Sequence, residues 1–494
     1  MDIEFKKEHI PIVLLLLISV TYFYLAFNTA MLGEDEGAYF FTSQQFLGLK
    51  FPSFLSPSQP LNYPPLVSLL SVPFFAVFGS TLNIAKFMIA LFGALTIILI
   101  YSIGKKTRWL FGSMAAFLLL SIPLFTQFMF LYYVEVPIAF FSLLSLVMFA
   151  SMDSIKKAIF TGSIMGLAFY VKFSAIFLPV ALLAFAVYKY LYKKEKNYLK
   201  LSIIACVFFA IIIAPFIARN LILYGFPYVD VLNLFFKEPN FTPLWVKDAA
   251  KILSPSTDII SVFGFLALIF CLEGITYFFV SKDEKLVLPI LVFVLFILLY
   301  YVRGVLNLGI AESRYFAIVF PQLALIGGYF ADKVYEKNKK YLIVLFGVIV
   351  LCTYLSFSVA LNTFSSTRYP QNYLDALKWI KQNTPANANI FTAYGGSLEM
   401  FAERTNVWAI GEFPQLMTTQ DTNYIYNTLV NYNVSYILIW RGIVAENYIV
   451  PESNLIGAFT YNFVNVVSND IQNNNQTHFS IDYQNQDNMV IKLI

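Results

Sequence analysis

Few charged side chains in this sequence could take part in chemistry, and they stand in short polar segments between long apolar runs. Glu34, Asp35 and Glu36 are consecutive, and Glu135 precedes another apolar run. Later segments add a group with both signs of charge: Lys172, Arg219, Arg303, Glu312 and Arg314. Charges near or within membrane-type segments are energetically costly, so we treat them as functional by default.

Carboxylates combined with lysine and arginine suit the transfer of a group from a lipid phosphate. A positioned aspartate or glutamate can take the proton of a hydroxyl that attacks an anomeric carbon. The departing phosphate develops negative charge, which arginine can bind through two parallel hydrogen bonds and lysine attracts as a point charge. The acidic residues are therefore candidate bases, and the basic residues are candidate phosphate ligands.

Several other chemistries lack the residues they need. The only histidines are His9 and His478, so there is no HExxH zinc motif and no Ser-His-Asp triad. The three cysteines all lie inside apolar runs, which favours small buried hydrophobes over a disulfide framework. The net charge of +4 is small and its lysines and arginines are scattered, which argues against a nucleic-acid partner.

The elements that position these residues are membrane helices, because 59% of the chain is hydrophobic and only 13% is charged. Lys6 and Lys7 precede the first apolar run and no small-residue cleavage site closes it, which predicts a retained first helix and a cytoplasmic N-terminus. Hydropathy and loop charge predict about eleven transmembrane helices. The expected spans are 10–28, 83–103, 111–131, 136–152, a pair within 158–188 that turns near Lys172, 199–217, 259–280, 286–302, 315–331 and 341–361.

The polar stretch after the first helix is expected to form one large outer loop over about residues 29–82. It contains a marginal apolar run, 64–79, with Pro73 at its centre. The basic cluster after the next run is cytoplasmic only if 64–79 does not fully cross, and whether it crosses stays open. On this topology the candidate acidic and basic residues all lie at the outer ends of the helices. We expect the membrane to be the cell membrane.

The composition changes from residue 362 onward, where acidic residues outnumber basic ones ten to six and no spanning run follows. DALKWIKQNT predicts an amphipathic helix, and NIFTAY and VSYILIW predict short buried strands. We therefore expect a transmembrane catalytic domain over 1–361 and a small α/β extracytoplasmic domain over 362–494. The second domain shows no acid and base constellation, so we expect it to bind the acceptor or act as a lid.

Simpler interpretations of the charged residues stay open. Three adjacent carboxylates also suit the N-terminus of a solvated amphipathic helix, where the helix dipole favours negative charge. Lys172 can extend its amine from an apolar segment to the membrane surface. Glu312 and Arg314 can form an ordinary structural pair. These alternatives explain less once acids and bases are considered together at one membrane boundary.

Six short motifs, in this order, resemble those of the GT-C superfamily of integral-membrane glycosyltransferases, particularly the protein O-mannosyltransferases and the lipid A aminoarabinose transferases. The resemblance covers about residues 10–361. The motifs are Asp35-Glu36 followed by Tyr39, Tyr63-Pro64-Pro65-Leu66, Glu135-Val136-Pro137, GLAFYVKFSAIFLP with Lys172, PFIARNLILYGFPY with Arg219, and Glu312-Ser313-Arg314-Tyr315 with Pro321. The sequence departs from the family pattern at Glu135, where aspartate is common, and in lacking a histidine beside Pro64-Pro65.

The resemblance implies an inverting transfer of a monosaccharide, mannose or similar, from a dolichyl or other polyprenyl phosphate to a protein, glycan or lipid acceptor. Asp35 would be the general base or an acceptor-side carboxylate, with Glu36 and Glu135 supporting the site. Lys172, Arg219 and Arg314 would bind the donor phosphate, and Tyr39, Tyr63 and Glu312 would contact substrate. Metal dependence varies across the superfamily, so a divalent cation, Mg²⁺ or Mn²⁺, at the acidic cluster stays open.

Two other functions compete with this one. A transporter or flippase of lipid-linked sugars predicts charged residues at mid-membrane and broken helices there, and the sequence shows neither pattern. A multi-subunit oligosaccharide-transferring enzyme of related architecture would normally carry a Trp-Trp-Asp motif, which is absent from the sequence.

Overall fold

The structure is a computed structural model of the chain. It describes residues 9–29, 34–48, 64–224, 264–281, 283–305, 313–338, 347–358, 369–392, 395–407, 416, 419–440, 463–472 and 478–494. The boundary predicted at residue 362 lies outside these ranges.

Most of the described chain is a bundle of apolar helices, as the composition predicts. The first part comprises α1 (His9–Asn28), α2 (Glu34–Leu47), α3 (Leu66–Phe78), α4 (Leu82–Lys105), α5 (Trp109–Leu120), α6 (Pro123–Phe128), α7 (Glu135–Ala150) and α8 (Ile155–Val171). The second part comprises η1 (Phe173–Ile176), α9 (Phe177–Lys193), α10 (Lys196–Tyr224), α14 (Phe265–Ser281), η3 (Glu284–Leu286), α15 (Val287–Val305), η4 (Ser313–Val319), α16 (Phe320–Lys337) and a helix over Gly347–Ser358.

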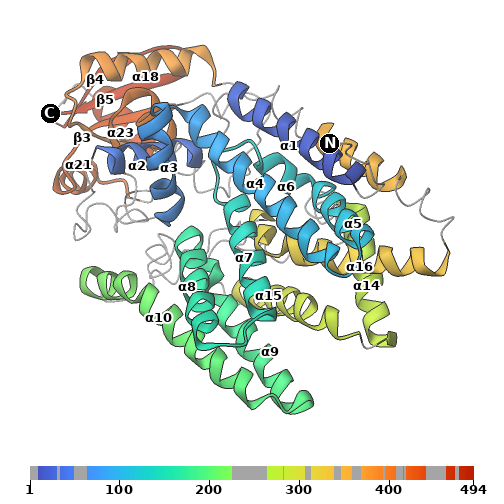
Figure 1. Cartoon of the computed structure of the whole chain (residues 1–494). Helices are drawn as coiled ribbons and strands as arrows, with labels where there is room; N and C mark the ends of the chain where they lie inside the picture. Colours follow the sequence, from blue (N-terminus) through green and yellow to red (C-terminus); the bar gives the residue numbers. More distant parts are fainter. Residues whose placement is uncertain are drawn as a thin grey trace.

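Five helical stretches of the described residues are long and apolar enough to cross a membrane: Pro11–Asn28, Leu82–Lys105, Phe173–Lys193, Lys196–Ile222 and Arg314–Lys337. Shorter apolar helices pack among them. The chain is therefore a multi-pass helical membrane protein, while the number of eleven crossings stays a prediction. In Figure 1, α1 and α4 lie side by side, and α10, in green, packs on α8 and α9.

One predicted span differs in form from the expectation, and the marginal run 64–79 forms a short helix. The run 111–131 is interrupted, because α5 ends at Leu120 and a short second helix starts at Pro123, whose ring removes a backbone N–H and stops helix propagation. In the marginal run, α3 has 13 residues and is about 20 Å long, shorter than the ~30 Å hydrocarbon core. It packs on α2 and α4, which agrees with an interfacial helix.

Close packing of α8 on α10 brings two candidate phosphate ligands to the same end of the bundle. A Cβ added to Gly162 would lie 2.2 Å from the Ala205 carbonyl oxygen, so the two backbones approach at a distance that only glycine allows. Further along, the rings of Phe173 and Phe216 lie 4.6 Å apart. Lys172 ends α8 and Arg219 lies one turn after Phe216, so this packing sets their separation.

The C-terminal part is a small α/β unit, as predicted. Its elements are α18 (Gln371–Asn383), β1 (Asn389–Phe391), α19 (Gly395–Ser397), η5 (Leu398–Ala402), β2 (Thr405–Asn406), α21 (Thr422–Asn431), β3 (Val434–Trp440), α23 (Val464–Gln472), β4 (Phe479–Gln484) and β5 (Asn488–Leu493). The strands form one sheet in the order β2-β1-β3-β5-β4, parallel across β2, β1 and β3 and antiparallel beyond.

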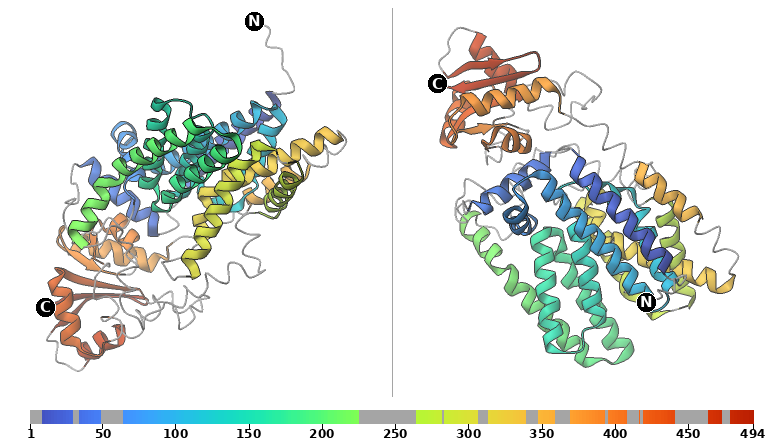
Figure 2. Two further views of the ribbon diagram at one scale, coloured as in Figure 1. Left: turned by 90° about the horizontal axis from the view of Figure 1, so that it is seen from below. Right: turned by 45° about the horizontal axis from the view of Figure 1, so that its top comes forward.

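This unit lies against one end of the helical bundle, beside α2 and α3 (Figures 1 and 2). The contact runs through α19 and η5, which pack on α2, and Met400 and Phe401 reach the main apolar core. Helix α2 is therefore held between the C-terminal unit on one side and α3 on the other.

Candidate active site

Charged residues predicted from distant segments meet at one end of the bundle. Asp35 lies in the first turn of α2, Glu135 is the first residue of α7, Lys172 caps the end of α8, and Arg314 lies in η4. Both carboxylates stand at helix N-termini, where unpaired backbone N–H groups and the helix dipole favour negative charge.

Four of these groups form a chain of alternating charge. Arg314 Nη1 donates to Asp35 Oδ2, and Arg314 Nε lies 3.8 Å from Glu135 Oε1. Lys172 Nζ donates to the same Glu135 oxygen over 2.8 Å. The side chain of Asp35 is 21% exposed and that of Glu135 only 2%, so Asp35 is the accessible end of the chain.

Glu135 has one oxygen with a free hydrogen-bonding capacity. Its Oε1 faces Lys172 and Arg314, whereas Oε2 is buried and has no hydrogen-bond partner among the residues that the structure describes. A buried carboxylate oxygen without a donor is energetically unfavourable. This oxygen can therefore accept a hydrogen bond from a hydroxyl group that enters the site.

Glu36 lies in a different environment from its neighbour Asp35. Its Oε1 accepts the backbone N–H of Tyr132 over 2.7 Å and lies 3.2 Å from Lys86 Nζ, and both side chains of the ion pair are fully buried. Lys86 also donates to the Thr29 carbonyl oxygen over 3.3 Å. Glu36 therefore fixes the first turn of α2 against α4 and the 129–134 connection.

Lys86 is the main site-region residue that the sequence analysis missed. It is a single lysine in the first turns of an apolar helix, and such a charge needs a partner. That rule was the available signal, but no spacing in the sequence indicates that the partner is Glu36.

Aromatic residues of the same connection line the site. Tyr132 Oη shares hydrogen bonds with Ser43 and Ser71 over 2.7 and 2.6 Å, which links α2 to α3. Tyr133 lies under Arg314, whose Cζ is 5.7 Å from the ring centroid. Burial, assisted by the nearby carboxylates of Asp35 and Glu36, raises the pKa of Tyr133 well above its usual range, so this hydroxyl stays protonated.

The remaining predicted residues divide into three groups. Arg219 is 2% exposed and donates to Asn220 Oδ1 over 3.0 Å in α10, beside the end of α8. Tyr39 is 4% exposed and packs its ring 6.2 Å from that of Tyr132, so it lies in the core behind the site. Tyr63 and Glu312 lie outside the described residues.

The described carboxylates do not fit a divalent cation. Asp35, Glu36 and Glu135 each face a lysine or arginine, and no three His, Cys, Asp or Glu side chains of the described residues gather in a metal-binding group. The divalent cation that the sequence left open therefore has no site among these residues. Among the described side chains, Lys172 and Arg314 stand beside Asp35 and Glu135, and lysine and arginine are the residues that bind a phosphate.

Comparison with known proteins gives a family model and several similar structures. Residues 62–217 match the model of the dolichyl-phosphate-mannose-protein mannosyltransferases. No curated protein matches the sequence. The oligosaccharyltransferase of Archaeoglobus fulgidus in the apo form has a TM-score of 0.66 at 15% identity, over 92% of this chain and 73% of that one.

Two further structures were solved with lipid phosphates. The Archaeoglobus fulgidus oligosaccharyltransferase AglB in complex with an inhibitory peptide and a dolichol-phosphate has a TM-score of 0.62 at 14% identity, over 90% of this chain and 72% of that one. ArnT from Cupriavidus metallidurans bound to undecaprenyl phosphate has a TM-score of 0.64 at 12% identity, over 97% of both chains. This chain thus has the fold of the GT-C membrane glycosyltransferases, and the resemblance predicted from its motifs is confirmed.

Proposed function

We propose that this protein is a glycosyltransferase that moves a monosaccharide, mannose or a similar sugar, from dolichyl or another polyprenyl phosphate to a protein, glycan or lipid acceptor. The observation that carries the proposal is the chain of charges Asp35–Arg314–Glu135–Lys172 at one end of the bundle. It offers an accessible carboxylate beside an arginine and a lysine, and a base and phosphate-binding cations are the two requirements of transfer from a lipid phosphate.

In the proposed reaction the acceptor oxygen attacks the anomeric carbon and the bond from that carbon to the phosphate oxygen breaks. The polyprenyl phosphate leaves with the bonding electron pair, and the acceptor proton passes to Asp35. Attack opposite the leaving group inverts the anomeric centre. Lys172, Arg219 and Arg314 bind the phosphate, whose negative charge increases as the bond breaks.

The ion pair between Arg314 and Asp35 couples donor binding to the base. An arginine that binds phosphate through two hydrogen bonds weakens its hold on a carboxylate. Donor phosphate at Arg314 therefore releases Asp35, so the base becomes available when the donor is present. Glu135 stays ion-paired with Lys172 through Oε1, and Oε2 of Glu135 accepts a hydrogen bond that orients a sugar or acceptor hydroxyl.

The site is proposed to lie at the outer face of the cell membrane, with the N-terminus in the cytoplasm. The support is the charge pattern of the loops. The C-terminal unit, which packs on the helix that carries Asp35, is proposed to bind the acceptor or to cover the site. The transporter alternative is not favoured.

The test is a transfer assay with purified protein in liposomes. Radiolabelled mannosyl, glucosyl and aminoarabinosyl polyprenyl phosphates are presented with membrane extract, and labelled peptide, glycan and lipid are separated. We expect one donor to be used. Asp35→Asn should lower the transfer rate by roughly 100-fold or more, the contribution of a positioned base. It should leave donor binding in place.

The matched control is Asp375→Asn, because Asp375 is a carboxylate on α18 that is bonded only to Gln371 among the described residues. Full transfer by Asp35→Asn would overturn the base assignment. Donor binding without transfer in the parent protein, combined with movement of the donor across the bilayer, would overturn the glycosyltransferase proposal in favour of transport.

A further inference from the structure

A glutamate lies at the midpoint of the apolar helix α14. The helix runs FLALIFCLEGITYFFVS, and Glu273 is about 12 Å from either end of it. The next residue, Gly274, packs on α16, where a Cβ added to the glycine would lie 2.7 Å from the Ile326 carbonyl oxygen. Ile326 stands at the middle of the candidate membrane span Arg314–Lys337. Glu273 is therefore at the level of the centre of that span.

The side chain of Glu273 points away from the bundle. Gly274 faces α16, and the residue before it on a helix points about 100° to one side. The exposed residues in the body of α14 have the spacing of a single helical stripe: Ile269, Leu272, Glu273, Thr276, Phe279 and Val280. Figure 1 shows α14 at the edge of the bundle, and its opposite side packs on α16 and α5. The stripe that contains Glu273 is thus a surface that contacts lipid.

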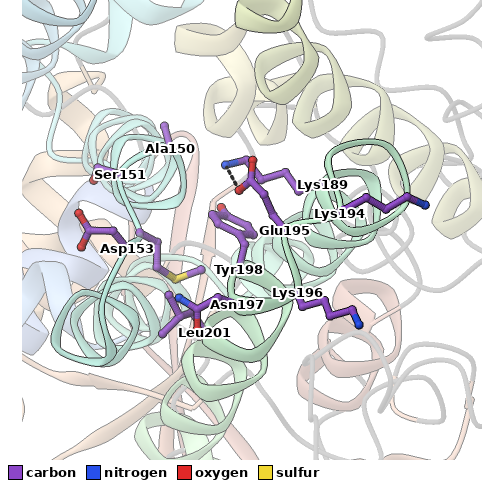
Figure 3. Close-up of a pocket in the computed structure, with 11 residues that line it drawn as sticks. Ala150, Ser151, Asp153, Lys189, Lys194, Glu195, Lys196, Asn197, Tyr198 and Leu201 are labelled. Carbon is purple, nitrogen blue, oxygen red and sulfur yellow. Dashed lines mark hydrogen bonds and ion pairs between the residues drawn. The ribbon is translucent and has the colours of Figure 1, made fainter.

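Other acidic side chains of the bundle have cationic partners. Figure 3 shows the ion pair between Glu195 and Lys189, 3.1 Å apart, at the turn between α9 and α10. Glu284 likewise pairs with Lys193 at the end of α9. Among the carboxylates of the bundle whose side chains the structure describes, Glu273 alone makes neither an ion pair nor a hydrogen bond.

A carboxylate in this position needs a partner. Ionised side chains within the hydrocarbon region are costly, and they usually face the bundle interior or pair with another charge. Glu273 is a charge at mid-membrane that was not recognised in the sequence, where such charges would favour a transporter. Because it points outward, it lines no path through the protein and gives no support to transport. A cation from outside this chain would satisfy it.

The charge also indicates which kind of partner fits. Two copies of the chain packed symmetrically through α14 would bring two Glu273 carboxylates together, and like charges repel most strongly where water is absent. The exposed lysines that the structure describes in the bundle lie within two turns of helix ends, so a second copy offers no described lysine at this depth. A helix of a different protein is the better match.

We propose that the exposed stripe of α14 binds a transmembrane helix of another membrane protein, and that this helix carries a lysine or arginine that pairs with Glu273. Ile269, Leu272, Thr276 and Phe279 are separated by alternating steps of three and four residues, the spacing of a seam between two packed helices. The proposal does not depend on the transferase activity, because α14 carries none of the site residues.

The test uses synthetic transmembrane peptides of leucine and alanine that carry one central lysine, leucine or glutamate. The full chain is reconstituted in phosphatidylcholine liposomes, and energy transfer from its tryptophans to a dansyl group on the peptide measures binding. Glu273→Gln removes the charge and keeps the shape of the side chain, whereas Glu273→Asp keeps the charge. The matched control is Asp375→Asn, which removes a carboxylate from α18, outside the bundle.

We expect the parent to bind the lysine peptide roughly ten-fold more tightly than the leucine or glutamate peptide, the effect of one strong polar contact between membrane helices. Glu273→Gln should bind the lysine and leucine peptides alike, while Glu273→Asp and Asp375→Asn keep the preference for lysine. Equal binding of these two peptides by the parent, or a lysine preference that persists in Glu273→Gln, would overturn the proposal. So would a dimer of the parent that dissociates in Glu273→Gln, measured by native mass spectrometry, because the partner would then be a second copy.

Discussion

Replacing Lys86 by methionine tests how the site is held. Methionine keeps an unbranched apolar stem that is one atom shorter than lysine, but it leaves the Glu36 carboxylate buried without its cation, 3.2 Å away in the parent protein. At an effective dielectric constant of about 20, unit charges at this distance attract by roughly 5 kcal/mol. Breaking a buried pair from one side typically costs about 3–5 kcal/mol, since one charge stays desolvated.

Part of the stability lost in Lys86→Met should be recovered when the Glu36 charge is removed as well. In Lys86→Met/Glu36→Gln the glutamine oxygen can still accept the Tyr132 N–H, and no buried charge is left. We expect the double variant to be about 2–3 kcal/mol more stable than Lys86→Met, because most of the cost of breaking a buried pair from one side comes from the charge left unpaired.

The assay is thermal unfolding of detergent-purified protein followed by tryptophan fluorescence, with Lys106→Met as an exposed control at the end of α4. We expect the parent and the control to share the highest unfolding midpoint. The double variant should unfold at a lower temperature, and Lys86→Met at the lowest. A Lys86→Met midpoint equal to that of the control, or a double variant no more stable than the single one, would refute the reasoning.

Three further predictions follow from contacts described above. Lys172→Gln should weaken donor binding by roughly ten-fold or more, since a charge-assisted hydrogen bond is lost, and Lys172→Arg should restore part of it; isotherms with the lipid donor measure this. Gly162→Leu should lower the unfolding midpoint because its Cβ would meet the Ala205 carbonyl, whereas Gly347→Leu, which meets nothing within 4 Å, should not. Tyr132→Phe should lower the free energy of unfolding by about 1–3 kcal/mol, because the hydroxyls of Ser43 and Ser71 lose their hydrogen bonds to Tyr132. An unchanged unfolding midpoint would contradict this prediction.

Hydropathy and loop charge predicted much of the fold because membrane helices follow from local composition. The helical pair that turns at Lys172 and the strands β1 and β3 of the C-terminal sheet appear where the sequence indicates. The break at Pro123 was missed, because the apolar run continues across it although the proline stops the helix. The strand order was also beyond reach, since it depends on contacts between distant segments.

The sequence predicted that the residues of the site lie together, but it did not predict which of them form ion pairs. Placing charged residues at helix ends on one side was enough to bring Asp35, Glu135, Lys172 and Arg314 together. It did not distinguish accessible Asp35 from buried Glu36, although the two are adjacent, because consecutive residues of a helix face different neighbours. That difference depends on Lys86, whose partner only the tertiary structure reveals.

The pair between Glu36 and Lys86 also has a consequence for biosynthesis. A lysine at the centre of a membrane helix opposes insertion by about 2.5–3.5 kcal/mol, and less near an end. The twelve leucine, isoleucine and phenylalanine residues of α4, at about 0.3–0.6 kcal/mol each, outweigh that penalty, so α4 can enter the bilayer before the lysine has a partner. Glu36 precedes Lys86 in the chain, so the nascent protein already contains the carboxylate that neutralises this lysine when α4 is made.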